Sequence, residues 1–309
     1  MTDSGFRVLR MFHPSHRVPS LEAAEDFYTR VFGRPSTRQS AMLGMAPTAE
    51  RPDYSTFTVI ADVLMDNIDP RKLWVNAVPA DTDVQPHLHN TGWYVDDPDA
   101  AFRAVRAAGI TATDQPGDAV EGDEAPKAGG VMPMFFTRPE QIGQRYQVTI
   151  TEAMPTDPRH AADWDVPEVS DDDPLGIRRC SHHTILTRDP SRGLRFVVDA
   201  LSGTVVHEGR NEVLGTASTY VHLGDGILEY AVPDAGTPAE ADLASRAPED
   251  SYHCLTWTVA DLDRVATHLA AEGVKIRNRT DTALVTDPAT SLGIPWAFTT
   301  EVLPGDPRG

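Results

Sequence analysis

Two stretches of the chain, 163 residues apart, share one pattern of hydrophobic and polar positions. Residues 55–70 (STFTVIADVLMDNIDP) and 218–233 (STYVHLGDGILEYAVP) each contain two apolar runs around a short turn. This pattern predicts a β-hairpin in each stretch. In each hairpin the second strand carries one acid between apolar neighbours, Asp66 or Glu229. The chain is therefore expected to contain an internal repeat.

Four amphipathic segments with marked ends follow apolar strand segments. Each begins at a residue whose side chain can cap a helix N-terminus, and each stops at a glycine. These pairs of residues are Ser20 and Gly33, Asp97 and Gly109, Asp189 and Gly203, and Asp261 and Gly273. The order of one strand, one helix and then further strands thus occurs four times.

The linker between the two halves is marked by its composition. Residues 155–174 contain six Asp, four Pro and few apolar residues. We therefore expect a first domain over residues 1–152, a linker over 153–176 and a second domain over 177–309. Residues 111–130 are acidic, rich in Gly, Pro and Ala, and without periodicity, so they are expected to form a long surface loop.

Composition narrows the class of protein. The chain has 309 residues, of which 40% are hydrophobic and 24% charged, and its net charge is −19. This acidity argues against nucleic acid or an anionic membrane as a partner, because both require basic patches. With no apolar run of 18 residues, no signal peptide and only two cysteines, the expectation is a cytoplasmic protein that acts on a small molecule. Homo-oligomers remain compatible with the sequence.

Histidines recur at equivalent strand positions. When the first and third helices are aligned at their terminal glycines, His13 coincides with His183. When the second and fourth helices are aligned at their N-caps, His89 coincides with His253. The predicted ligand sets are therefore His13, Asp66 and His89 in the first half, and His183, Glu229 and His253 in the second. A lone strand histidine is ordinarily structural, but two histidines with one carboxylate suit a divalent metal with open coordination positions.

The module resembles that of a known superfamily. A β-α-β-β-β unit with a histidine on its first strand and a carboxylate on its last resembles the vicinal oxygen chelate superfamily. The segments that carry the resemblance are His183-Thr-Ile-Leu-Thr and Ile227-Leu228-Glu229-Tyr230. That superfamily includes glyoxalases, bleomycin resistance proteins and extradiol dioxygenases. The resemblance implies an α+β fold of four tandem modules, paired into two domains whose curved mixed sheets surround a cavity.

Some positions depart from the superfamily's pattern. Its second carboxylate falls at Gln147 in the first half and at Ala297 in the second, and neither residue is an anionic ligand. His89 and His253 also stand one residue early, which leaves Cys254 at the expected position in the second half. A β-bulge would restore the facing of the histidines. Without a bulge, Cys254 would replace His253 as the ligand.

Three functions remain open. The first is an Fe(II) ring-cleaving dioxygenase that acts on a small aromatic diol, as the four-module architecture and the resemblance imply. The second is a glyoxalase-like isomerase, lyase or epimerase using Ni, Co, Zn or Mn, and the third is a metal-free binding or resistance protein. His222, on the strand before Glu229, is the candidate general base. We place the metal in the second half, although Gln147 gives the first half a fourth potential ligand.

Overall fold

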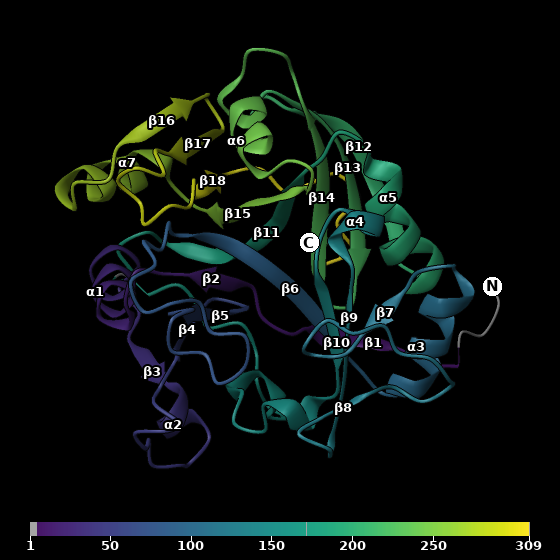
Figure 1. Ribbon diagram of the computed structural model, residues 1–309. Helices are drawn as coiled ribbons and strands as arrows, with labels where there is room; N and C mark the ends of the chain where they lie inside the picture. The colour runs from purple at the N-terminus through teal and green to yellow at the C-terminus, as the bar shows by residue number, and fades with distance from the viewer. Residues whose placement is uncertain (1–4, 171, 309) are drawn as a thin grey trace.

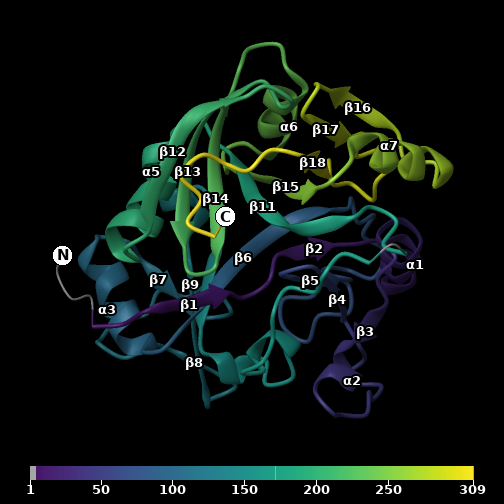
Figure 2. The same cartoon turned by 180° about the vertical axis from the view of Figure 1, so that it is seen from behind.

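The computed structural model describes residues 5–170 and 172–308, which form two mixed β-sheets (Figures 1 and 2). Over these residues the first sheet has the order β3-β4-β5-β2-β6-β10-β9-β7, with β1 added to β6 and β8 to β9. Its strands are β1 Val8–Met11, β2 Ser15–Arg17, β3 Ser36–Arg38, β4 Ser55–Ile60, β5 Val63–Ile68, β6 His87–Val95, β7 Ala112–Thr113, β8 Lys127–Ala128, β9 Met132–Thr137 and β10 Tyr146–Thr149.

The second sheet repeats this arrangement in the order β12-β13-β14-β11-β15-β18-β17-β16. Its strands are β11 Ile177–Leu186, β12 Thr204–Asn211, β13 Thr216–Leu223, β14 Gly226–Pro233, β15 Ser251–Val259, β16 Ile276–Arg279, β17 Ala283–Thr286 and β18 Ala297–Thr299. Each sheet therefore joins two β-α-β-β-β modules through an antiparallel pair, β2 with β6 and β11 with β15. The expected α+β fold of four tandem modules is confirmed.

The helices begin and end where the capping residues predicted. The Ser20 side chain accepts a hydrogen bond from the backbone N–H of Ala23, and Gly33 ends the helix with φ of 65°. Asp97, Asp189 and Asp261 cap the other three module helices in the same way. The helices are α1 Leu21–Phe32, α2 Gln39–Met42, α3 Pro98–Ala107, α4 Pro139–Ile142, η1 Thr151–Ala153, η2 Pro158–His160, α5 Pro190–Leu194, η3 Arg195–Ala200, α6 Pro238–Arg246 and α7 Leu262–Ala271.

The third module differs from the first by one inserted residue in its helix. α5 continues directly into η3, which is a π-helix. A π-helix accommodates one more residue than the α-helix at the same length. The cap-to-glycine segment 189–203 is accordingly one residue longer than its counterpart 20–33. Because of this extra residue, an alignment of Gly33 with Gly203 places the strand residues before the two helices one position out of register.

Both predicted hairpins are present, and their turns join the two halves. Asp62 lies in the β4–β5 turn, and its Oδ1 accepts a hydrogen bond of 2.6 Å from the backbone N–H of Cys180. Asp225 lies in the β13–β14 turn, and its Oδ1 accepts one of 2.7 Å from Met11. The same contact therefore runs in both directions, as internal two-fold symmetry requires.

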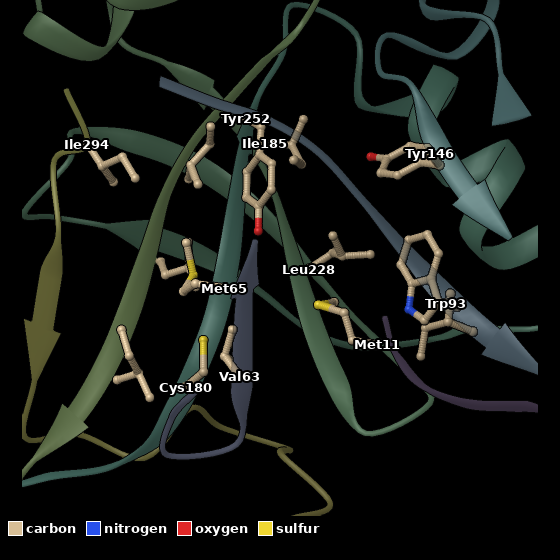
Figure 3. Close-up of a cluster of buried hydrophobic side chains, with 14 of the residues drawn as sticks. Met11, Val63, Met65, Trp93, Tyr146, Cys180, Ile185, Leu228, Tyr252 and Ile294 are labelled. Atoms are coloured by element: carbon tan, nitrogen blue, oxygen red, sulfur yellow. The ribbon is translucent and has the colours of Figure 1, made fainter. Parts of the chain in front are cut away.

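One hydrophobic core spans both halves. Figure 3 shows residues of the first half, including Met65 and Trp93, in one cluster with second-half residues such as Leu228 and Tyr252. The hydroxyls of Tyr146 and Tyr230 lie 2.8 Å apart in this core. The helix-bearing faces of the two sheets are thus buried against each other, and the opposite faces are left to form sites.

Two further features bear on the sequence predictions. Residues 111–130 were expected to form a long surface loop, and residues 114–126 are irregular and mostly exposed, while the two-residue strands β7 and β8 near its ends pair with β9. Residues 153–176 contain η2 and lie outside both sheets over the described positions. No described helix is long and apolar enough to cross a membrane.

Candidate functional site

Strand register identifies the equivalent residues of the two halves. β2 pairs with β5 so that Ser15 faces Asp66, and β11 pairs with β14 so that Thr184 faces Glu229. The histidine two residues earlier shares that face, which makes His182 the counterpart of His13. The alignment of His13 with His183 is thereby corrected. The π-helix η3 is the physical reason, because its extra residue shifts the terminal glycine by one position.

His183 lies on the opposite face of the sheet from Glu229. It pairs with Leu228, and its Nδ1 is 2.6 Å from the hydroxyl of Tyr252 in the shared core. Burial and the charge of Arg308 lower the pKa of His183 to about 3, so the ring is neutral. The expectation that His183 and Glu229 share one site does not fit this geometry, because a one-residue step along a strand changes the face.

Glu229 is fully buried and surrounded by donors. Its Oε1 accepts hydrogen bonds from Tyr220 at 2.8 Å and Asn211 at 3.0 Å, and its Oε2 accepts one from Thr184 at 2.5 Å. The Nε2 of His182 lies 3.3 Å from Oε2. Burial opposes ionisation, but the charge of His182 and hydrogen bonds from His182, Thr184 and Ser218 lower the pKa of Glu229 to about 2. The carboxylate is therefore ionised and fixed.

His182 connects Glu229 to a cavity. The cavity has a volume of about 250 Å³, and His182, Tyr220 and Thr256 form part of its lining. The Nδ1 of His182 lies 3.0 Å from Oγ of Ser181, which also lines the cavity. A register shift between Cys180 and His182 marks a bulge at Ser181. The candidate site residues that the sequence predictions did not select are thus His182, Thr184, Asn211 and Tyr220.

Of the two alternatives that the sequence left open, the one with a β-bulge is present in both halves. In β15 the register passes from Cys254, opposite Thr184, to Tyr252, opposite Ile185, so His253 is the extra residue. In the first half the register of β6 passes over His89 in the same way. His253 Nδ1 lies 3.7 Å from Asp242 Oδ2 rather than against Glu229.

Neither Cys254 nor His222 completes a ligand set with Glu229. Sγ of Cys254 is 3.4 Å from Oγ1 of Thr184, and burial raises the pKa of the Cys254 thiol to about 12. His222 shares the face of Tyr220, two residues further along β13. The described lining of the 250 Å³ cavity does not include His222, so its predicted role as general base has no support from this geometry.

The first-half site has the same framework with weaker contacts. His13 Nδ1 lies 3.7 Å from Oδ2 of Asp66 and 3.4 Å from Oγ of Ser15. The buried Oδ1 of Asp66 has no hydrogen-bond partner among the described residues. Burial raises the pKa of Asp66 to about 7 and lowers that of His13 to about 3.

The other two predicted first-half ligands have different partners. His89 Nε2 lies 3.0 Å from Nη2 of Arg17, whose guanidinium donates to the ring nitrogen. The amide of Gln147 contacts Sδ of Met134 at 3.3 Å. Neither side chain is engaged with Asp66, and a cation already occupies the lone pair of His89.

A divalent metal held by three or more protein ligands does not fit the described residues. No group of three or more His, Cys, Asp or Glu among them is arranged to hold a metal ion. At Glu229 the surrounding groups are hydrogen-bond donors, and His182 is the one metal-binding type among its direct contacts. The arrangement instead suits a histidine–carboxylate pair, with His182 Nε2 at 3.3 Å from Glu229 Oε2.

The comparisons with known proteins agree with this fold. Residues 10–125 match the family model described as Glyoxalase/Bleomycin resistance protein/Dioxygenase superfamily. The match agrees, over these residues, with the resemblance to the vicinal oxygen chelate superfamily that the sequence indicated. No match was found among curated proteins.

Several solved structures share the fold over nearly the whole chain. A variant of 4-hydroxymandelate synthase from Streptomyces coelicolor aligns with a TM-score of 0.62 and 14% identity, over 97% of this chain and 95% of that one. The 2,3-dioxygenase LapB from Pseudomonas sp. KL28 aligns with a TM-score of 0.58 and 11% identity, over 98% and 96%. The Mn(II)-bound glyoxalase from Novosphingobium aromaticivorans aligns with a TM-score of 0.58 and 16% identity, over 98% and 86%.

Proposed function

We propose that the chain is an enzyme that transfers a proton to or from a small molecule bound in the second-half cavity. In this proposal His182 is the acid–base group and Glu229 positions its ring. The observation that carries the proposal is the 3.3 Å contact between His182 Nε2 and Glu229 Oε2 at the wall of a 250 Å³ cavity. The reaction class is that of an isomerase, lyase or epimerase.

The chemistry of the pair supports this role. An ionised carboxylate fixes the orientation of an imidazole and stabilises the imidazolium that forms when the ring accepts a proton. The hydrogen bonds from Tyr220, Asn211 and Thr184 hold Glu229 in place, so the pair is organised before a ligand arrives. The lining includes the hydroxyl-bearing residues Tyr220 and Thr256, which suit a substrate with oxygen atoms.

The experiment that tests this proposal first identifies small molecules that bind the protein. Wild-type protein is screened by thermal shift against small α-hydroxy ketones, 2-hydroxy acids and catechols, and each ligand found is incubated in D₂O and followed by proton NMR. We expect exchange of a carbon-bound proton next to a carbonyl, with loss of that exchange in His182→Asn. The control His268→Asn changes a histidine on α7 whose Nε2 contacts the Val31 carbonyl at 2.9 Å. Equal exchange in both variants would remove His182 from the reaction.

A second candidate is the ring-cleaving dioxygenase that uses Fe(II) and a small aromatic diol. What favours it is the likeness over almost the full chain to 4-hydroxymandelate synthase and to the 2,3-dioxygenase. It ranks second because the described residues lack a three-ligand site. Elemental analysis of protein purified without added metal, with O₂ uptake measured on catechols, separates the two. Stoichiometric iron with O₂ uptake would favour the dioxygenase, and proton exchange after treatment with a chelator would favour the first proposal.

A further inference from the structure

A second histidine, His207 of β12, lies in the same row of side chains as Glu229. Strand register places Thr184 opposite Glu229 and Glu229 opposite Tyr220. Tyr220 in turn lies opposite His207. Residues directly opposite each other in a sheet share one face, so the row lies on the face that carries the cavity of about 250 Å³. His207 lines this cavity, and proton transfer by His182 alone gives it no role.

The Tyr220 ring lies between His207 and His182. The centre of the His207 ring is 5.7 Å from the centre of the tyrosine ring, and the centre of the His182 ring is 5.2 Å from it. β12 and β14 pair with opposite edges of β13, and β11 lies beyond β14, so the two histidines approach Tyr220 from opposite sides. A small molecule seated over Tyr220 in the cavity therefore has one histidine on either side.

Gly209 provides the space that the His207 ring occupies. The two residues are two positions apart on β12 and so share a face. A Cβ atom at position 209 would lie 2.6 Å from Nε2 of His207, closer than the ring could tolerate. Gly209 is not among the glycines with a positive φ, so it matters here because it lacks a side chain. The missing side chain lets the ring lie along the strand at the cavity wall.

The nitrogens of His207 are available for proton transfer. Within residues 5–170 and 172–308 neither ring nitrogen has a hydrogen-bond or ion-pair partner, and the half-buried ring packs against Tyr220. The acids of the same lining are less suited, because Glu212 pairs with Arg210 at 3.4 Å and Glu301 is exposed. Histidine is also the side chain that most readily exchanges a proton near neutral pH.

We infer that His207 is a second acid–base group and that the enzyme inverts a stereogenic carbon next to a carbonyl group. The inference rests on the proposed function, in which His182 transfers the first proton. Of the isomerase, lyase and epimerase reactions, two acid–base groups on either side of the ligand select the epimerase or racemase. The substrate class is a chiral carbonyl compound with a hydrogen on the carbon next to the carbonyl.

The proposed reaction has two proton transfers. Nδ1 of His182, the ring nitrogen that does not face Glu229, takes the proton from one side of the carbon. The electron pair of the broken C–H bond moves toward the carbonyl oxygen, which gives an enolate. Protonated His207 then donates its proton to the opposite side of the carbon, and the returning electron pair forms the new C–H bond. Exchange with water restores both histidines, and the reverse reaction uses His207 as the base.

The experiment follows each enantiomer of two probes with the full chain in D₂O. The probes are acetoin, an α-hydroxy ketone, and lactate, a 2-hydroxy acid. Proton NMR measures exchange of the carbon-bound hydrogen, and circular dichroism measures inversion. We expect wild-type protein to invert at least one probe, with deuterium in the product. The enantiomer whose hydrogen faces His182 is called the first enantiomer, and the other is called the second.

The variants separate the two histidines. His207→Gln should slow inversion by about 10²-fold or more and stop exchange of the second enantiomer, while the first still exchanges within about threefold of the wild-type rate. Gly209→Ala should give the same pattern, because the new Cβ displaces the ring. The control His222→Gln changes a histidine on the same face of β13 but outside the described cavity lining, and inversion should stay within about twofold.

Three results would overturn the inference. They are exchange without inversion in wild-type protein, inversion at the wild-type rate in His207→Gln, and equal loss of exchange for both enantiomers in His207→Gln, which would indicate a structural role. Each of these leaves proton transfer by His182 in place. Failure of the proposed function has a different signature, since wild-type protein would then exchange neither probe, and the assignment of His207 would fall with it.

Discussion

The equivalent carboxylates Asp66 and Glu229 have opposite electrostatic environments. Glu229 faces Tyr220 across its hairpin, and the tyrosine hydroxyl donates to it, whereas Asp66 faces Phe57, which has no donor. The neighbouring histidine is 3.3 Å from Glu229 but 3.7 Å from Asp66. The charge of His182 and hydrogen bonds outweigh burial at Glu229 and lower its pKa to about 2, whereas burial raises the pKa of Asp66 to about 7.

Equivalent positions of the two halves can therefore hold either an ionised carboxylate or a protonated acid. Strand register fixes where the side chain stands, and the residue opposite it in the hairpin supplies or withholds a hydrogen bond. Substitutions at the hairpin partners Tyr220 and Phe57 should therefore reduce or increase the difference in pKa between Glu229 and Asp66.

The largest expected effect is on turnover. His182→Asn should reduce the rate of proton exchange by about 10²–10⁴-fold, the usual contribution of a general acid or base. The matched variant His13→Asn should change it by only a few-fold. The rates are measured in D₂O by proton NMR, with the substrate that the ligand screen identifies. Loss of activity confined to the His13 variant would move the reaction centre to the first half.

Next in size is the effect of neutralising each carboxylate on the free energy of unfolding. Glu229→Gln replaces an acceptor with an amide that cannot satisfy Tyr220, Asn211 and Thr184 together, and should cost about 3 kcal/mol. Asp66→Asn should leave the free energy of unfolding unchanged or raise it, because it removes a buried carboxyl whose raised pKa disfavours folding at pH 7 and whose Oδ1 has no partner among described residues. Urea denaturation at pH 7 measures both. Similar costs for the two variants would contradict the contrast.

The contributions of Glu229 and Asp66 to stability should depend on pH in opposite directions. Glu229 has a folded-state pKa of about 2 against an ordinary 4.5, so its stabilisation is present above pH 4.5 and lost as the pH falls toward 2. Asp66 has a folded-state pKa of about 7 against an ordinary 3.8, so it favours folding at low pH and this contribution is lost as the pH rises toward 7. Chelator-treated wild type should therefore lose stability from pH 4 to 7 relative to Asp66→Asn. A difference that is flat over this window would refute the assignment to Asp66.

The smallest effect comes from exchanging the hairpin partners. Tyr220→Phe removes one donor from buried Glu229 and should destabilise the protein by about 1–2 kcal/mol. Phe57→Tyr offers Asp66 a donor and should lower the pKa of Asp66 with little change in stability. Carboxyl titration and urea denaturation measure the two results. If Tyr220→Phe left the pKa of Glu229 unchanged, the tyrosine would not account for the contrast.

The sequence predicted most of the fold because local signals mark it. Caps such as Ser20 and Asp261 and terminal glycines such as Gly33 define the helices, and the two similar hairpins define the repeat. A bulge at His89 and at His253 was one of two alternatives and is present, but His253 contacts Asp242 and not Glu229.

The site was harder to predict because it depends on register. Glycine spacing selected His183, since nothing in the residue pattern marks η3 as a π-helix. Spacing from the N-cap would have selected His182, because His13 precedes Ser20 by the same seven residues that separate His182 from Asp189. The hairpin turn would also have placed Tyr220 opposite Glu229. The donor Asn211 comes from β12, and no local signal predicts its contact.

The most direct test is a carbon-13 NMR titration of the carboxyl groups in chelator-treated protein, with Asp66→Asn and Glu229→Gln used to assign the two resonances. The account predicts that Glu229 titrates near pH 2, if at all before acid unfolding, and that Asp66 titrates near pH 7. Titration of both carboxyls near pH 4 would contradict it, because the donors around Glu229 and the burial of Asp66 would then have no effect on ionisation.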